Sequence, residues 1–384
     1  MKAFIAEADW APRAGYKPTE KEQATRWAVS GSLLYKNPKL HMVERERPTP
    51  AHDELLLRVR YCGICGSDVH VYETDAEGYV IFSGPTKLPC VLGHEYSAEV
   101  VDMGRDVSGF EKGDLVTGES VLWCGKCEPC RRGMVNQCKS VELMGLTVDG
   151  AFADYITMPA RFCWKLNGLV SRMGEDAALK VGSLVEPVGC AYNGIYISST
   201  GVVPGDTAVV YGAGPIGLGA IALLRATGAS RVVAVDVVPE RRALATKLGA
   251  DAVFDGRMDN LRAALEDALG GLKADIQVEA AGVPDITMPL MQDMAAPRGR
   301  MIYLGRAGTL AKVDLNRIVS GAHSIIGSRG HSGYGIFANI IRLMEGGRLD
   351  ALSEIVTSVY PLDKIGEAFD ASRSRTDGKI LIGI

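Results

Sequence analysis

The pattern of hydrophobic and polar positions divides the chain into two parts. Up to about residue 160, short segments such as 54–61 and 96–101 alternate between apolar and polar residues, and Gly, Pro and Asp separate them. Alternation with a period of two is typical of strands that bury one face. We therefore expect antiparallel strands and loops in this part, with two further strands at 2–6 and 40–45.

The second part, from about residue 188, alternates apolar segments of strand length with Ala- and Leu-rich segments of helical length. Repeated strand–helix–strand units indicate a parallel sheet with helices on both faces. The pattern predicts strands at 208–211, 231–236, 251–254, 276–279 and 300–304, and helices at 215–226, 239–248, 261–268 and 286–294. In the tail it predicts a helix at 336–345 and strands at 353–359 and 379–384.

Residues 11–36 interrupt the first pair of predicted strands. This stretch is polar but contains Tyr16, Trp27 and Tyr35. The simpler interpretation is an insertion on the surface. The alternative is a flap over a substrate cleft or a contact between subunits.

Composition narrows the class of protein. The chain has 384 residues, of which 47% are hydrophobic and 23% charged, and this length predicts two or three domains. The formal net charge of −4 gives no reason to expect a nucleic-acid or membrane partner. The uncharged stretch 207–224 contains four glycines and a proline, so a strand, turn and buried helix explain it better than a membrane span. With no export signal apparent near Met1, we expect a cytoplasmic protein.

Four of the nine cysteines form a cluster with the spacing of a metal site. They follow the pattern C-x2-C-x2-C-x7-C, with glycine and proline between them: Cys124, Cys127, Cys130 and Cys138. Four thiolates satisfy the tetrahedral preference of zinc and leave no open position, which is typical of a structural site. An iron–sulfur cluster uses the same ligands. We favour structural zinc.

A second set of residues has the composition of a catalytic zinc site. Cys65, His94 and a glutamate, either Glu95 or Glu186, would supply a thiolate, an imidazole and a carboxylate, with water in the fourth position. Zinc in such an open site acts as a Lewis acid and lowers the pKa of a bound hydroxyl. Asp68 is a candidate for orienting the His94 ring, because ligand imidazoles usually donate their other N–H.

Ser67 and His70, in the segment C-G-S-D-V-H, are candidates for proton transfer beside this zinc. A neutral imidazole accepts a proton near pH 7, so the two side chains could pass a proton from the bound hydroxyl to solvent. The alternative is a hydrogen-bonded pair with no kinetic role.

A glycine-rich motif marks a dinucleotide site. Gly212, Gly214 and Gly217 form G-x-G-x-x-G directly after a predicted strand and at the start of a helix, together with Pro215 and Ile216. The glycines allow a tight turn, an approach of the backbone to pyrophosphate, and close packing of the helix on the sheet.

An acidic residue at the end of the next predicted strand points to the type of dinucleotide. Asp236 would accept from the adenosine ribose hydroxyls and repel a 2′-phosphate, which favours NAD over NADP. Arg241 and Arg242 point the other way, since an arginine can bind a phosphate. A contact near the adenine is a simpler role for them.

With these motifs in place, the chain resembles the zinc-dependent medium-chain alcohol and polyol dehydrogenases over nearly its whole length. The resemblance is carried by GICGSDVH, LGHE, the four-cysteine lobe, GAFADY, LVEP and GAGPIG. Within the family it is most similar to the sorbitol, threonine and glucose dehydrogenase branch. Further segments, TDAEGY, LWCGKCEPC and SRGHSGYG, look like the scyllo-inosose dehydrogenases.

The resemblance implies an α/β architecture of two domains: a chaperonin-10-like β-barrel catalytic domain and a Rossmann domain with a doubly wound parallel sheet. The first would comprise residues 1–189 and 330–384, and the second residues 190–329. It implies one catalytic zinc and one structural zinc per chain, with NAD as the hydride acceptor. It also places Ala281 and Arg329 near the nicotinamide, and assigns the proton relay to Ser67 and His70.

The implied activity is oxidation of a secondary hydroxyl of a polyol, sugar or cyclitol to a ketone, by a homodimer or homotetramer. In some relatives the residue matching Glu95 is the third zinc ligand, and in others the residue matching Glu186, so the sequence leaves both open. A threonine or amino-alcohol dehydrogenase is an alternative within enzymes. A non-catalytic structural protein that binds zinc and NADPH on the same fold is the alternative from another class.

Overall fold

The computed structural model describes residues 1–306 and 308–384, and these form two compact units. Unit 1 comprises Met1–Glu186, Ser358–Ser374 and Ile380–Ile384, and unit 2 comprises Pro187–Thr357 and Arg375–Lys379. The domain boundaries expected from the sequence placed residues 330–357 in the first domain, whereas the structure groups them with unit 2. Their apolar side chains are buried there, because η4 (Asp350–Ile355) packs against α8 (Pro215–Ala226) and α9 (Pro239–Lys247).

Unit 2 is built on a six-stranded parallel sheet with the strand order β13-β12-β11-β14-β15-β16. This order reverses direction between β11 and β14, as in a doubly wound dinucleotide-binding fold. The expected Rossmann-type sheet is thus confirmed. Its strands are β11 (Thr207–Tyr211), β12 (Arg231–Val235), β13 (Ala252–Phe254), β14 (Ala274–Glu279), β15 (Ala295–Tyr303) and β16 (Ser324–Gly327).

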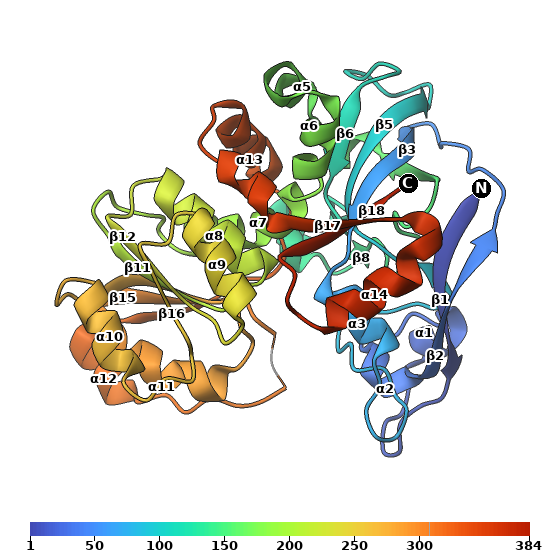
Figure 1. The fold of residues 1–384 in the computed structure, drawn as a ribbon. Coiled ribbons are helices and arrows are strands. Elements are labelled where there is room, and N and C mark those ends of the chain that lie inside the picture. The colour runs from blue at the N-terminus through green and yellow to red at the C-terminus, as the bar shows by residue number, and fades with distance from the viewer. Residues whose placement is uncertain (307) are drawn as a thin grey trace. The chain divides into compact units, whose positions relative to one another are not determined.

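Helices cover both faces of this sheet because the strands bury side chains on both sides. Val209, Tyr211, Val233 and Val235 pack against the apolar side chains of α10 and α11, while α8 and α9 contact the strands separately (Figure 1). The remaining elements of unit 2 are α10 (Leu261–Ala268), α11 (Pro284–Met294), α12 (Leu315–Gly321) and α13 (Ile336–Glu345). The segment that enters the unit forms α7 (Val185–Tyr192), followed by the π-helix η3 (Asn193–Ser198).

Two features of unit 2 differ from the expected elements. The strand expected at 353–359 begins only at Val356, since residues 350–355 form η4, which buries Leu352 and Ile355. The sixth strand, β16, was not predicted. It has only four residues, most of them exposed, so it lacks the long apolar run of a central parallel strand.

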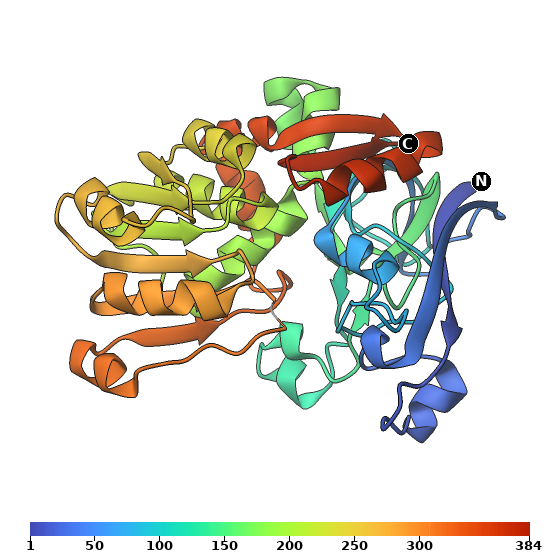
Figure 2. The same cartoon turned by 60° about the horizontal axis from the view of Figure 1, so that its bottom comes forward.

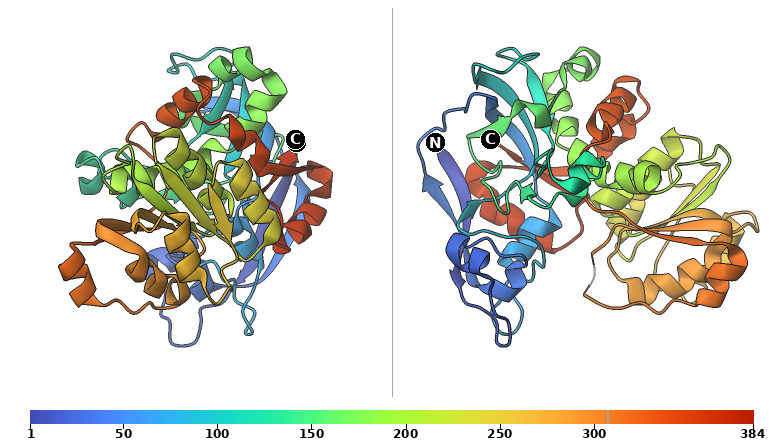
Figure 3. Two further views of the ribbon diagram at one scale, coloured as in Figure 1. Left: turned by 60° about the vertical axis from the view of Figure 1, so that its left-hand side comes forward. Right: turned by 180° about the vertical axis from the view of Figure 1, so that it is seen from behind.

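Unit 1 consists of small sheets around a hydrophobic core. In the largest sheet β3 pairs antiparallel with β5, β9 and β18, and a three-stranded sheet has the order β2-β1-β4. Figure 3 shows this unit from behind. Its strands are β1 (Lys2–Trp10), β2 (Tyr35–Glu44), β3 (Glu54–Gly63), β4 (Cys90–Val91), β5 (Glu95–Met103), β6 (Leu115–Gly118), β7 (Val121–Leu122), β8 (Glu142–Leu143), β9 (Tyr155–Pro159), β10 (Cys163–Lys165), β17 (Val356–Pro361) and β18 (Lys379–Gly383).

The helices of unit 1 are short and lie in its connections. They are α1 (Glu20–Thr25), α2 (Gly31–Leu34), α3 (Gly66–Tyr72), α4 (Glu128–Arg131), α5 (Asn167–Met173), α6 (Glu175–Gly182) and α14 (Ile365–Arg373), with single turns η1 (Val135–Gln137), η2 (Ala160–Phe162) and η5 (Leu362–Lys364). Two of them, α1 and α2, lie within the insertion at 11–36. Across residues 1–306 and 308–384, the helices lack the combination of length and apolar character that crossing a membrane requires.

Candidate active site and metal centres

The first candidate metal site lies where α3 and β5 begin. Cys65 directly precedes α3, and His94 and Glu95 lie at the start of β5. The Cys65 sulfur, a ring nitrogen of His94 and a carboxylate oxygen of Glu95 all lie within 4.8 Å of one another. His94 and Glu95 are buried, and Cys65 is half-buried. One thiolate, one imidazole and one carboxylate converging in this way fit the donor set of an open zinc site.

Asp68 holds the two halves of this site together. Its side chain is fully buried, and one carboxylate oxygen accepts from the Cys65 amide at 2.9 Å. The other oxygen accepts from the Gly93 amide at 3.2 Å and lies 3.5 Å from His94 Nδ1. Gly93 has φ +90°, and a Cβ there would lie 2.8 Å from the Phe152 ring, so this turn requires glycine. Asp68 therefore fixes Cys65 and His94 relative to each other.

The charges around His94 favour a cation at this place. Burial alone would lower the pKa of His94, but Asp68 and Cys65 outweigh it and raise the pKa well above its ordinary value. A positive charge is thus stabilised here by a carboxylate and a thiol. A divalent cation would be stabilised by the same groups.

Ser67 reaches the metal ligands, whereas His70 lies further along the same helix. The Ser67 hydroxyl is 3.2 Å from His94 Nε2. His70 is half-buried in the last turn of α3. The two candidates for proton transfer are therefore three residues apart on one short helix, which places them on the same face.

Of the two glutamates that the sequence left open, Glu95 belongs to the group formed with Cys65 and His94. Glu186 is also buried, and its carboxylate accepts from the Ser120 hydroxyl at 2.9 Å. Sequence analysis did not single out Ser120, because a serine between two short strands carries no motif of its own.

The four-cysteine lobe forms a second candidate metal site. Its four sulfurs lie within 4.8 Å of one another: Cys124, Cys127, Cys130 and Cys138. Backbone amides point at these sulfurs, as in the bond from the Cys127 amide to Cys124 Sγ at 3.4 Å and from the Ser140 amide to Cys138 Sγ at 3.3 Å. Figure 2 shows the lobe in blue-green. Four converging sulfurs with amide donors fit a closed zinc site.

The thiols of this lobe differ in their acidity. Hydrogen bonds from backbone amides lower the pKa of Cys124 to about 6, and also lower that of Cys127. Burial raises the pKa of Cys130 to about 12. A metal that binds all four sulfurs must therefore displace a proton at Cys130, whereas Cys124 is already a thiolate at neutral pH.

The other cysteines differ among themselves. Cys62, Cys90 and Cys163 are buried, as expected of packing residues. Cys190 is only half-buried, and its sulfur lies 3.8 Å from His331 Nδ1.

The glycine-rich turn lies between β11 and α8 at the point where the strand order of unit 2 reverses. Gly212 has φ +91°, and a Cβ there would lie 2.6 Å from the Ala281 amide. A Cβ on Gly217 would lie 1.8 Å from the Gly212 carbonyl oxygen. A Cβ on Gly214 meets only Arg241 Nη1, at 3.7 Å. Packing thus explains why positions 212 and 217 require glycine. No protein atom prevents a side chain at Gly214, as expected of a residue whose backbone faces a ligand.

Asp236 lies at the end of β12, beside this turn. Its carboxylate accepts from the Ala213 amide at 2.7 Å and from the Val238 amide at 2.8 Å. Arg242 donates to the Asp236 carbonyl and pairs with Asp255 at 3.3 Å. Of the two arginines considered from the sequence, Arg242 is thus engaged with acidic partners, while Arg241 lies beside Gly214.

The loops after β14 and β15 meet the same turn. Gly282 has φ +73° and lies against the Arg306 carbonyl. Arg329 is partly buried, which lowers its pKa, and Arg306 lowers it further. Asn193 Nδ2 donates to the carbonyl oxygens of Arg329 and Gly330 at 3.1 and 2.8 Å. These residues belong to unit 2, as does the glycine-rich turn.

Comparison with known proteins agrees with this geometry. The profile of the alcohol dehydrogenase GroES-like domain matches residues 51–168, and that of the zinc-binding dehydrogenases matches residues 215–346. A scyllo-inosose 3-dehydrogenase of Thermotoga maritima is 37% identical over 99% of this chain and 98% of its own length. The chain belongs to the zinc-dependent medium-chain alcohol and polyol dehydrogenases.

Two further relatives show how broad the family is. An L-threonine 3-dehydrogenase of Shewanella woodyi is 33% identical to this dehydrogenase over 89% of the chain and 95% of its own length. The solved structure of a putative alcohol dehydrogenase from Thermotoga maritima superposes with a TM-score of 0.96, at 34% identity and complete coverage of both chains. The dehydrogenase is accordingly an enzyme that uses zinc and a nicotinamide dinucleotide and acts on a small molecule.

The dehydrogenase has one buried carboxylate near the dinucleotide turn that sequence analysis missed. Glu279 ends β14 and is fully buried. One of its oxygens accepts from the Gly282 amide at 2.9 Å, and a Cβ on Gly305 would lie 2.6 Å from the other. Burial raises the pKa of Glu279. Its position at the carboxyl end of a central parallel strand, like that of Asp236, is the signal that would have found it.

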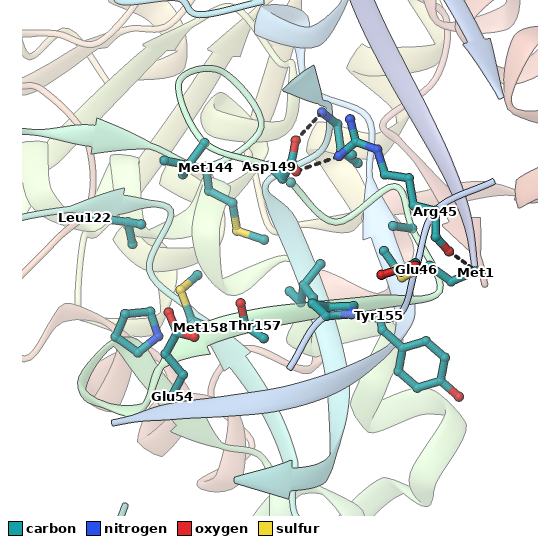
Figure 4. A pocket seen from close by; sticks show the side chains of 17 residues that line it. Met1, Arg45, Glu46, Glu54, Leu122, Met144, Asp149, Tyr155, Thr157 and Met158 are labelled. Atoms are coloured by element: carbon teal, nitrogen blue, oxygen red, sulfur yellow. Dashed lines mark hydrogen bonds and ion pairs between the residues drawn. The ribbon is translucent and has the colours of Figure 1, made fainter. Parts of the chain in front are cut away.

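A cavity of about 340 Å³ in unit 1 of the dehydrogenase is separate from both metal sites. Figure 4 shows its lining, where Arg45 pairs with Asp149 at 2.7 Å and Met144 and Met158 supply apolar surface. The candidate zinc ligands are not among its lining residues. We assign no function to this cavity.

Proposed function

We propose that the dehydrogenase oxidises a secondary hydroxyl of a polyol, sugar or cyclitol to a ketone and transfers the hydride to NAD+. The observation that carries this proposal is the convergence of Cys65, His94 and Glu95, with the Ser67 hydroxyl beside the histidine. The choice of substrate class is supported by the 37% identity with a protein named scyllo-inosose 3-dehydrogenase.

In this proposal Cys65, His94 and Glu95 hold the catalytic zinc. Glu95 is favoured over Glu186 as the third ligand because its carboxylate lies within 4.8 Å of the ligand atoms of Cys65 and His94. Zinc bound there supplies a Lewis acid that polarises the substrate oxygen. The four cysteines of the lobe hold the structural zinc: Cys124, Cys127, Cys130 and Cys138.

The reaction releases one proton and one hydride from the alcohol. Ser67 accepts the hydroxyl proton and passes its own proton to His70, from which it reaches solvent. With NAD+ bound, the carbon that carries this hydroxyl would give up its hydrogen as hydride to the nicotinamide, so the products would be a ketone, NADH and one proton. Asp68 keeps the His94 ring in the orientation that binding requires.

The dinucleotide binds at the carboxyl ends of the strands of unit 2. Backbone amides at the start of α8 meet the pyrophosphate. We assign to this site Gly212, Gly214, Pro215, Ile216, Gly217, Asp236, Arg241, Ala281 and Arg329. Two observations support this assignment: the backbone of Ala281 lies directly against Gly212, and the space beside Gly214 is open.

NAD rather than NADP is proposed on electrostatic grounds. The Asp236 carboxylate would repel a 2′-phosphate and accept from the ribose hydroxyls. The pairing of Arg242 with Asp255 removes one of the two arginines that could have compensated for that repulsion.

The test is a panel of inositols, inososes, aldoses and other polyols with NAD+ and NADP+, followed by absorbance of the reduced cofactor. We expect turnover of at least one cyclic polyol with NAD+, at a higher kcat/KM than with NADP+. Cys65→Ser should retain dinucleotide binding and lose turnover. Cys163→Ser is the matched control, because Cys163 is a buried cysteine that belongs to neither candidate zinc site. Turnover by Cys65→Ser close to that of the unaltered enzyme would refute the zinc mechanism.

A threonine or amino-alcohol substrate is the second candidate, because the Shewanella woodyi relative is named an L-threonine 3-dehydrogenase. Including L-threonine and simple amino alcohols in the same panel separates the two. Turnover of threonine alone would favour this candidate.

We further propose that the dehydrogenase is a cytoplasmic homodimer or homotetramer. The edge of the parallel sheet supports this assembly: β16 lies at the end of the strand order (Figures 1 and 2). Around it Leu315, Val319 and Ile325 are 72%, 80% and 42% exposed. Exposed apolar side chains beside an open sheet edge are typical of subunit contacts. Val319→Asp should shift the mass in solution toward the monomer, and an unchanged mass would contradict the proposed contact.

A further inference from the structure

The second half of the insertion is bonded along the segment that joins the two halves of the zinc site. Ala28 and Thr86 exchange backbone hydrogen bonds of 2.8 and 3.0 Å, and the Gly31 amide donates to the Gly84 carbonyl at 3.0 Å. The Ser32 amide donates to the Phe82 carbonyl at 2.9 Å. Residues 78–88, which we call the connecting segment, run between α3 and His94. The insertion therefore holds this segment by its backbone.

The connecting segment in turn holds the end of α3. The Phe82 amide donates to the His70 carbonyl at 3.1 Å, and the Ile81 amide donates to the Glu73 carbonyl at 3.0 Å. Phe82 thus bonds through its amide to the helix and through its carbonyl to Ser32 of the insertion. Figure 1 shows α1 and α2 near α3 in this part of the unit.

A buried carboxylate organises the insertion itself. Glu22 is 3% exposed and accepts from the Thr19 amide at 2.8 Å, from the Val29 amide at 3.1 Å and from the Tyr16 hydroxyl at 3.0 Å. Burial would raise the pKa of Glu22, but these bonds outweigh it and lower the pKa. Glu22 thereby joins the first half of the insertion to Val29, which follows the Ala28 that bonds to Thr86.

Arg13 makes a second connection, directly to the loop after α3. Its guanidinium pairs with Asp75 and lies 4.2 Å from the centre of the Tyr79 ring. Its Nε donates to the Ser32 carbonyl at 3.2 Å. Asp75 also accepts from the Tyr79 amide at 3.0 Å, so this ion pair fixes the start of the connecting segment.

We propose that insertion 11–36 is a brace that positions the C-terminal end of α3, and with it the proton-accepting His70. Glu22 and Arg13 are its positioning residues. Asp68 already ties Cys65 to the turn before His94. The brace therefore acts on the proton path, while the metal ligands are held by Asp68. This inference rests on the proposed role of His70. It stands beside the earlier interpretations of the insertion as a surface segment, a flap over a substrate cleft or a contact between subunits.

The test compares Glu22→Gln with Glu20→Gln, an exposed acid on the same helix. Glutamine keeps the shape but turns an amide group toward the donors of Thr19 or Val29. We expect amide hydrogen exchange at residues 28–37 and 78–86 to become about tenfold faster, and kcat to fall about tenfold. KM for NAD+ and a content of two zinc ions per chain should not change. Glu20→Gln should match the unaltered enzyme in every measurement.

A double-mutant cycle with His70→Gln separates positioning from a general loss of stability. If the brace acts through His70, Glu22→Gln should lower kcat much less in the His70→Gln background than alone. Arg13→Ala, with the exposed Lys17→Ala as its control, should reproduce the effects of Glu22→Gln through a different contact.

Three outcomes would overturn the proposal. The first is faster exchange with an unchanged kcat, the second is unchanged exchange at residues 78–86, and the third is equal loss of kcat with and without His70. Hydrogen exchange requires no substrate, so it judges the brace even where the unaltered enzyme oxidises no polyol. Failure of the unaltered enzyme to oxidise any polyol would refute the proposed function and not the brace.

Discussion

Replacing Asp68 by asparagine tests the geometry of the zinc site at its most connected residue. The carboxylate faces three donors: the Cys65 amide at 2.9 Å, the Gly93 amide at 3.2 Å and the His94 ring nitrogen Nδ1 at 3.5 Å. Asparagine fills the same space but has one acceptor oxygen, so its amide group must face a donor. The substitution also removes the negative charge that raises the pKa of His94.

The size of the effect follows from these contacts. In the zinc-bound enzyme the His94 ring is neutral, so the loss comes from the orientation of the ring and the partner of its other nitrogen, 3.5 Å from Asp68, rather than from an ion pair. Losing a partner that orients a ligand histidine typically costs 10- to 100-fold in metal affinity, or about 1.4 to 2.8 kcal/mol. We expect Asp68→Asn to fall within that range for the catalytic zinc alone.

The assay is the release of zinc to a coloured chelator, in which the two sites of the holoenzyme appear as separate phases. In Asp68→Asn the phase assigned to Cys65 and His94 should be faster, and the phase of the four-cysteine lobe should be unchanged. Asp176→Asn serves as control, because the Asp176 carboxylate in α6 bonds to Tyr61 and Lys180 and to none of the candidate zinc ligands. Equal release from Asp68→Asn and the unaltered enzyme would refute the reasoning.

Three other predictions follow from the packing and the pKa shifts. Gly217→Ala should lower the free energy of unfolding by about 1 to 3 kcal/mol and weaken NAD binding, because the new Cβ meets the Gly212 carbonyl oxygen. Gly214→Ala should weaken NAD binding without lowering the free energy of unfolding. Calorimetric titration with NAD and thermal melting distinguish the two variants. Cys127→Ser should lower the melting temperature by on the order of 5 °C and leave kcat per folded molecule little changed; an unchanged melting temperature contradicts a structural site. Because the pKa of Glu22 is lowered in the folded chain, its contribution to stability is present above pH 4.5 and is lost as the pH falls through the lower folded value. Amide hydrogen exchange at residues 28–37 should report this loosening, and a Glu22→Gln variant should show no such pH dependence there.

The parallel sheet was predictable from the sequence because each of its elements is locally consistent. The helix expected at 215–226 has those bounds in the structure, since Pro215 is favoured in the first turn and the apolar side chains that follow are buried. Helix 261–268 likewise has the expected bounds. Parallel strands buried on both faces leave a near-continuous apolar run, and its short length between turn residues distinguishes it from a helix. A short exposed strand such as β16 leaves no such signal.

The metal ligands were predictable as residue types but not as a set. Nothing in the local sequence distinguishes Glu95 from Glu186, because both are buried glutamates beside turn-forming residues. Their difference arises from which strand or helix brings each carboxylate near Cys65. Long-range contacts of this kind depend on the packing of the whole unit, so the local sequence leaves both glutamates open.

The full set of bonding partners of a buried carboxylate was hardest to foresee from the sequence, even where the residue itself was singled out, as Asp68 was. Each carboxylate combines a local bond, from the Thr19 amide to Glu22 or from the Cys65 amide to Asp68, with a bond from a residue further along the chain. That second partner, the Val29 amide for Glu22 and the Gly93 amide for Asp68, is what the local sequence does not reveal. A buried carboxylate that accepted nothing would cost several kcal/mol, so its presence in a polar stretch implies that several amides converge on it. In residues 11–36 that convergence orders a segment whose composition alone indicates a loop. Glu22 is therefore one point at which substitution or acid should loosen the insertion, while the Arg13 contacts and the backbone bonds to residues 82–86 hold it elsewhere.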